Sequence, residues 1–166
     1  MDGNAMRPQS AIQLTLHGRT IGGPRPLICV PLMAASRDAL LEQADQVDGL
    51  QPDLIEWRVD ALEGLSDLAY VRRTLKALRA GRPDLPLLFT CRAREEGGVQ
   101  TIAPDHRRKL YRMAIGTGLV DLIDIELASG PATIQALRAE TAAVGVHLIL
   151  SFHAFDGTPG RAVLVG

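Results

Sequence analysis

The sequence predicts an α/β fold built on a parallel sheet, because apolar runs and helical segments alternate along its 166 residues. Runs of this length, bounded by glycine, proline and aspartate, are typical of buried parallel strands. Strands that alternate with helices form right-handed β/α units on one sheet. The five runs are residues 27–32, 54–59, 87–91, 119–125 and 146–152.

Helices are predicted between the runs, where apolar residues lie three or four positions apart. Before the first run, residues 12–21 alternate around the tripeptide His17-Gly18-Arg19, which predicts a short hairpin. In a barrel this hairpin could close the bottom. The helical spacing is carried by Leu40, Leu41, Ala44 and Val47, then by Leu68, Val71, Leu75 and Leu78, and later by Leu110, Met113 and Ala114.

Five β/α units are too few to close a (β/α)₈ barrel, which typically takes about 250 residues. We therefore expect residues 1–166 to form one domain, either an open sheet or an incomplete barrel. Neither GxGxxG nor GxxxxGK[ST] follows the first run, so a nucleotide-binding doubly wound fold lacks its usual support.

Composition favours small-molecule chemistry. The 18 Lys and Arg balance the 19 Asp and Glu and are interspersed with them, so no basic face suggests nucleic acid. The N-terminus lacks the apolar core of a signal peptide, and no stretch approaches the roughly 18 apolar residues of a membrane span. We expect a soluble cytoplasmic protein that contacts neither nucleic acid nor membrane.

Ionisable residues end four consecutive runs, although strands covered on both faces are normally apolar. In the second run, a period of two places Glu56, Arg58 and Asp60 on one face. If all these faces point to one interior, the polar groups gather where barrel enzymes place their active sites. The later runs contribute Thr90 and Arg92, then Asp124 and Glu126, and finally Ser151 and His153.

Two interpretations of this cluster compete. Buried arginines and carboxylates often pair for structure alone, but four consecutive strands with such ends favour a functional site. His153 is the one histidine of four at the carboxyl end of a run, which makes it the candidate base. A metal held by Glu56, Asp124, Glu126 and His153 ranks second, because Arg58 and Arg92 would oppose a bound cation.

A turn rich in glycine, residues 94–98 (REEGG), follows the third run directly. Its two glycines permit either a mobile lid over the site or an ordinary β/α turn, and the pattern alone does not separate the two.

Four motifs in this order resemble those of type I 3-dehydroquinate dehydratases, over about residues 12–159. The motifs are EWRVD at 56–60, LLFTCR with EGG within 87–98, DLIDIEL at 121–127 and SFHAFDGTP at 151–159. The resemblance implies the (β/α)₈ TIM-barrel family, here as about five units preceded by the hairpin.

By this resemblance the protein is a lyase of the shikimate pathway, which serves aromatic amino acid biosynthesis. It would convert 3-dehydroquinate into 3-dehydroshikimate and water through an imine with an enzyme lysine, without metal or organic cofactor. A homodimer is one possible assembly. The implied roles are general base for His153, ring orientation for Glu96, substrate binding for Glu56, Arg58 and Arg92, and support for Asp60, Asp124 and Glu126.

The family's imine lysine lies on the sixth strand, whereas this sequence ends at Gly166, so we expect a C-terminally truncated domain. Lys76 and Lys109 lie in helical segments and match no position of that lysine. Three hypotheses follow: an enzyme completed by another chain, an inactive fragment, or a module that binds polyhydroxy acids. A metal-dependent aldolase or isomerase is a weaker fourth.

Overall fold

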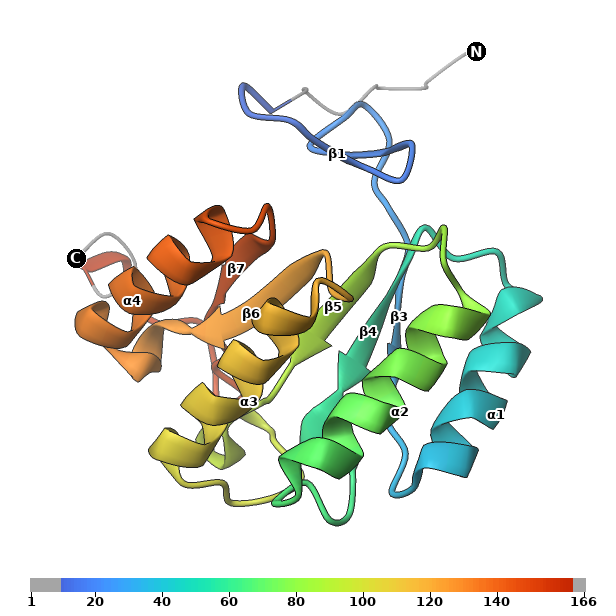
Figure 1. Ribbon diagram of the computed structural model, residues 1–166. Coiled ribbons are helices and arrows are strands. Elements are labelled where there is room, and N and C mark those ends of the chain that lie inside the picture. Colours follow the sequence, from blue (N-terminus) through green and yellow to red (C-terminus); the bar gives the residue numbers. More distant parts are fainter. Residues whose placement is uncertain (1–9, 163–166) are drawn as a thin grey trace.

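The structure is a computed structural model that describes residues 10–162, and a parallel sheet of five strands forms its centre (Figure 1). The strand order β3-β4-β5-β6-β7 follows the chain, so each β/α unit adds its strand beside the previous one. The strands are β3 (Cys29–Leu32), β4 (Leu54–Arg58), β5 (Leu87–Thr90), β6 (Leu122–Glu126) and β7 (His147–Ser151).

The four α-helices of the described residues cover one face of this sheet, as Figure 1 shows. A doubly wound sheet reverses its strand order and carries helices on both faces, whereas a barrel winds in one direction. The predicted fold class, α/β of the barrel type with about five β/α units after a hairpin, is therefore confirmed, as five parallel strands and four α-helices within the described residues. The helices are α1 (Arg37–Asp48), α2 (Leu68–Gly81), α3 (Pro104–Thr117) and α4 (Pro131–Ala142). None of the described helices is long and apolar enough to cross a membrane.

The main core lies between the sheet and the helices. Trp57 and Phe89 on neighbouring strands meet edge to face, with ring centroids 5.5 Å apart, and Phe89 meets Tyr111 of α3 at 6.3 Å. All three side chains are buried. Because side chains alternate along a strand, this apolar face leaves the opposite face of β4 and β5 for other residues.

The predicted hairpin is confirmed, as β1 (Leu14–Leu16) paired antiparallel with β2 (Arg19–Ile21). Its two turn residues, His17 and Gly18, both have positive φ (46° and 76°), as a tight two-residue turn requires. The hairpin lies beyond the end of the sheet where the strands begin (Figure 1). There it contributes to a second apolar cluster, formed by Leu14, Leu16, Ile21, Leu27, Leu54, Leu88, Leu122 and Ile149.

Asp121, just before β6, anchors the hairpin to the sheet. Its carboxylate lies 2.8 Å from His17 Nε2 and accepts hydrogen bonds from Arg79 and from the backbone N–H of Leu87. Burial opposes ionisation of Asp121, but the Leu87 N–H, His17 and Arg79 outweigh it and lower the pKa of the carboxyl. The bottom of the sheet is thus covered by apolar contacts, and the ionised Asp121 holds the hairpin there.

Asp53, just before β4, makes a second anchor at this end. It accepts two hydrogen bonds from Arg25, at 2.6 and 2.9 Å, and one from the Ile28 N–H at 2.8 Å. The Arg25 side chain, followed by the Ile28 N–H, lowers the pKa of Asp53 to about 2, although burial acts in the opposite direction.

Replacing Asp53 by asparagine should make the stability of the protein less sensitive to acid. An unfolded aspartate titrates near about pH 3.9, so the contribution of Asp53 is complete above that pH and is lost as pH falls through about 2. In urea titrations, the free energy of unfolding of Asp53→Asn should fall less between about pH 5 and about pH 2 than that of the unaltered protein. The exposed control Asp156→Asn should follow the unaltered protein, and equal slopes for all three proteins would contradict this account.

Candidate active site

The polar face of the sheet begins with Arg58 at the end of β4. Its guanidinium donates two hydrogen bonds of 2.9 Å to the carboxylate of Asp60, which is fully buried. Asp60, followed by smaller effects of Glu56 and Asp124, raises the pKa of Arg58 against the opposing effect of burial. Asp60 lies beside Arg58 as predicted, but strand alternation is not the reason. The strand ends at Arg58, and Asp60 returns to it from the 3₁₀ turn η1 (Val59–Ala61).

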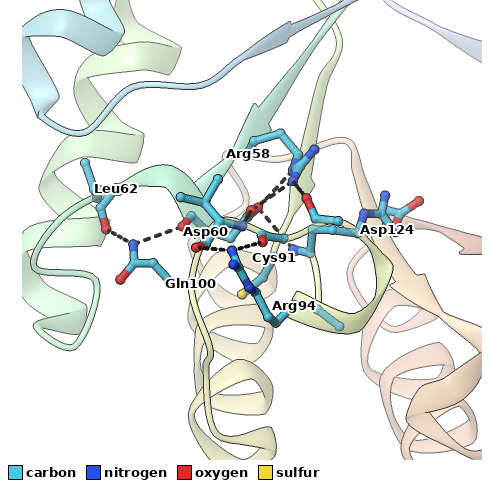
Figure 2. A network of polar contacts seen from close by, with 12 residues as sticks. Arg58, Asp60, Leu62, Cys91, Arg94, Gln100 and Asp124 are labelled. Carbon is cyan, nitrogen blue, oxygen red and sulfur yellow. Dashed lines mark hydrogen bonds and ion pairs between the residues drawn. The ribbon is translucent and has the colours of Figure 1, made fainter. Parts of the chain in front are cut away.

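Asp60 also holds the two segments that follow β5. Its Oδ1 accepts the backbone N–H of Arg92 at 3.1 Å, and its Oδ2 accepts that of Val99 at 3.0 Å. Figure 2 shows the surrounding network, in which the Gln100 side chain donates to the carbonyl groups of Asp60 and Leu62. One buried carboxylate therefore connects the ends of β4 and β5.

Arg92 is the centre of the predicted cluster. Its side chain is buried, and its Nη1 lies 2.7 Å from Ser151 Oγ, 3.0 Å from Asp124 and 3.2 Å from Glu126. The expected pairing of the two carboxylates with an arginine is therefore observed. The same nitrogen lies 3.3 Å from His153 Nδ1.

His153 lies just beyond β7 and is oriented by Glu96 of the turn η2 (Arg94–Glu96). Glu96 Oε2 lies 2.9 Å from His153 Nδ1 and also accepts the backbone N–H of His153 at 2.9 Å. The Glu96 contact requires a proton on Nδ1, whereas a hydrogen bond from Arg92 would require a lone pair there. The Glu96 contact is shorter and joins opposite charges when the ring is protonated, so we assign the proton to Nδ1. Nε2 then carries the free lone pair.

The pKa values of Asp124 and Glu126 shift in opposite directions, although both residues lie on one strand. Burial raises the pKa of Asp124 more than Ser151 and Arg92 lower it. Burial acts on Glu126 too, but the Ala93 N–H and Arg107 outweigh it and lower its pKa. Arg107, from helix α3, is a member of the cluster that sequence reasoning missed. No signal in the sequence distinguished it from the other arginines of that helix.

Glu56 lies on β4, two residues before Arg58, and is half-buried. It is the register partner of Pro31 on β3 and of Leu88 on β5, so it lies closer than Arg58 to the start of the sheet. Arg92 and Glu96 thus both contact His153. Arg58 is connected to Arg92 through Asp60, and Glu56 lies two residues before Arg58 on β4.

The glycine-rich turn is anchored at several points. Arg58 donates to the Gly97 carbonyl at 3.3 Å, and a Cβ at Gly97 would come within 2.9 Å of the Phe155 ring. Gly98 lies even closer to the backbone, because a Cβ there would be 2.3 Å from the Arg92 carbonyl oxygen. These contacts favour the ordinary β/α turn over the mobile lid.

The metal interpretation gains no geometric support. Among residues 10–162, no three His, Cys, Asp or Glu side chains are grouped so that they could hold a metal ion. Asp124 and Glu126 face arginines instead. Of the other histidines, His17 contacts Asp121 and His106 contacts the Leu65 carbonyl.

A cavity of about 330 Å³ lies behind the cluster, between α3 and the start of α4. Glu96 and Glu126 take part in its lining, and so do Arg107 and Tyr111 of α3. His153, Arg58 and Arg92 do not line it, so it is separate from the face that presents the histidine.

A sheet wound in one direction, with ionisable groups at the carboxyl ends of its strands, defines the β/α-barrel class of proteins. Residues 28–165 match the family described as Type I 3-dehydroquinase, and the chain belongs to this family. It is 39% identical over 158 residues to the 3-dehydroquinate dehydratase of Albidiferax ferrireducens and 38% identical over 152 residues to that of Bacillus subtilis. These matches cover 94% and 92% of this chain but 60% of each relative, so the chain spans about 60% of their length.

Solved structures agree with this assignment. The type I 3-dehydroquinate dehydratase of Clostridium difficile superposes with a TM-score of 0.89 at 36% identity, over 93% of this chain and 61% of that one. The enzyme of Geobacillus kaustophilus gives the same TM-score at 35% identity, over 94% and 61%.

Replacing Gly98 by alanine should destabilise the protein by at least about 2 kcal/mol, since the new methyl group would meet backbone atoms of Arg92 and Ala93. The matched control is Gly116→Ala in helix α3, where a Cβ meets nothing within 4 Å. That change should stabilise the protein by about 0.5–1 kcal/mol. Thermal and urea unfolding of both variants measure the difference, and a Gly98→Ala protein as stable as the unaltered one would refute the contact.

Proposed function

We propose that this chain supplies the proton-transfer and hydroxyl-binding groups of a 3-dehydroquinate dehydratase, which converts 3-dehydroquinate into 3-dehydroshikimate and water. Family membership supports the choice of substrate. The observation that carries the chemistry is the contact of 2.9 Å between Glu96 and His153 Nδ1, because it leaves Nε2 free to act as a base.

His153 removes a proton from the carbon next to the substrate's imine. An iminium group withdraws electrons from this carbon, so a base as weak as imidazole can take the proton. The imidazolium then returns the proton to the departing hydroxyl group, which leaves as water. Glu96 stabilises the imidazolium between these two steps and keeps the ring in place.

Arg58, Arg92 and Glu56 bind the hydroxyl groups of the substrate. Guanidinium groups donate hydrogen bonds to hydroxyl oxygens and a carboxylate accepts from hydroxyl hydrogens, so the set is suited to a polyhydroxy acid. Asp60, Asp124 and Glu126 hold the two arginines and do not contact the substrate in this proposal.

The imine amine is not one of the two lysines of this sequence. Lys76 and Lys109 are exposed on helices α2 and α3, which cover the apolar face of the sheet. We propose that the amine occupies the sixth-strand position that the family resemblance implies. Borohydride treatment in the presence of 3-dehydroquinate should therefore leave Lys76 and Lys109 unmodified, as peptide mass analysis can show.

Binding of 3-dehydroquinate tests the proposal directly. Isothermal titration of the purified chain should show saturable binding, and Arg58→Lys should weaken it by about tenfold, because an ammonium group cannot hold Asp60 and a hydroxyl in the fork geometry of arginine. Arg72→Lys, at an exposed position of α2, should bind as the unaltered chain does.

Enone absorbance reports product formation in the same samples. Binding without turnover agrees with the proposed division of roles, because the imine amine is not one of the lysines of this chain. Turnover by the purified chain would overturn the assignment of the amine, and its loss in His153→Ala would still support His153 as the base. Failure to bind 3-dehydroquinate, or equal affinity in the Arg58→Lys and unaltered proteins, would overturn the proposal.

A further inference from the structure

Arg107 of helix α3 clamps the backbone from which Arg92 emerges. Its Nε and Nη2 donate to the Cys91 carbonyl at 3.1 and 2.9 Å, and the Tyr111 hydroxyl donates to the same oxygen at 3.1 Å. Nη2 also contacts Glu126 Oε2, and the Arg107 side chain is 13% exposed. One guanidinium thus holds both a main-chain carbonyl and a buried carboxylate.

Glu126 connects Arg107 to the residues around His153. Its other oxygen, Oε1, accepts the Ala93 N–H at 2.9 Å and Arg92 Nη1 at 3.2 Å. Since that Nη1 lies 3.3 Å from His153 Nδ1, a continuous series of contacts joins Arg107 to the histidine.

We propose that Arg107 is a positioning residue, which acts through Glu126 to place Arg92 and to set the charge that His153 experiences. This inference rests on the proposed role of His153 as the base. Arg107 does not touch the substrate in this scheme. It balances Glu126, so that the positive charge of Arg92 stays directed at the histidine.

The charged groups around His153 and around Arg107 determine whether loss of Arg107 favours or disfavours the protonated form of His153. His153 faces Glu96 of η2 and Arg92, and behind Arg92 lie Asp124 and Glu126 of β6. Without Arg107, Glu126 would neutralise Arg92 more fully, and the protonated form of His153 would be favoured. Arg107 itself faces the following groups: Cys91, Glu126 and Tyr111, with Glu95, Glu96 and Arg108 on the side of the cavity.

NMR titration of the His153 ring tests this inference in the intact chain without substrate. The resonance is assigned by its loss in His153→Ala. In Arg107→Gln, the titration midpoint of His153 should rise by about half a pH unit or more, as expected for the loss of one charge in a buried network. In Glu126→Gln the midpoint should fall, because the positive charge of Arg92 is then less compensated.

Two controls separate positioning from a general effect. Arg108→Gln removes the adjacent charge, which pairs with the exposed Asp105 in the first turn of the same helix, and it should leave the midpoint unchanged. Arg107→Ala should recover the original midpoint when guanidinium is added at millimolar concentration, since the cavity of about 330 Å³ beside Arg107 gives access to its position.

Opposite shifts in Arg107→Gln and Glu126→Gln, with recovery by guanidinium, support the inference. It is wrong if the midpoint stays unchanged in Arg107→Gln, or if Arg108→Gln produces the same shift. If Arg107→Gln does not fold, the sign of the shift in Glu126→Gln decides. Because the titration needs no substrate, its outcome is independent of whether 3-dehydroquinate binds.

Discussion

The buried carboxylate of Asp60 is the interaction on which the rest of the site depends. It accepts four hydrogen bonds from three segments: two from Arg58, one from the Arg92 backbone and one from the Val99 backbone. A buried carboxylate is tolerated when its oxygens are satisfied in this way. Asp60 therefore fixes three features together: the orientation of the Arg58 side chain, the point where Arg92 leaves the sheet, and the end of the glycine-rich turn.

Beyond Asp60, positive and negative side chains alternate along the carboxyl ends of the strands. Arg92 lies between Asp124 and Glu126, and Glu126 lies between Arg92 and Arg107. This alternation explains how consecutive parallel strands can carry ionised groups on one face. It also explains the opposite pKa shifts on β6, because Glu126 contacts two arginines and a backbone N–H, whereas Asp124 has one arginine and a hydroxyl.

Hydrophobic periodicity is sufficient to predict the order of strands and helices, because an element that buries one face has apolar residues at regular spacing within its own segment. The hairpin can also be predicted from neighbouring residues, because its turn needs the conformational freedom of Gly18. Strand alternation extended beyond Arg58 places Asp60 on the strand, whereas in the structure a 3₁₀ turn begins after Arg58. Glu96 was assigned from family resemblance and not from pattern, and Arg107 was missed, because both contacts join segments that only the folded chain brings together.

Glu96 uses a single oxygen to accept both the main-chain and the ring N–H of His153. Once the first of these bonds has formed, the second is intramolecular and costs little additional entropy, much as a chelating ligand gains from its second donor. The path of the chain after β7 therefore determines the orientation of the imidazole. In the proposed mechanism, Nε2 would gain and lose a proton with little reorganisation of the surrounding dipoles, which is the condition under which electrostatic stabilisation is most effective.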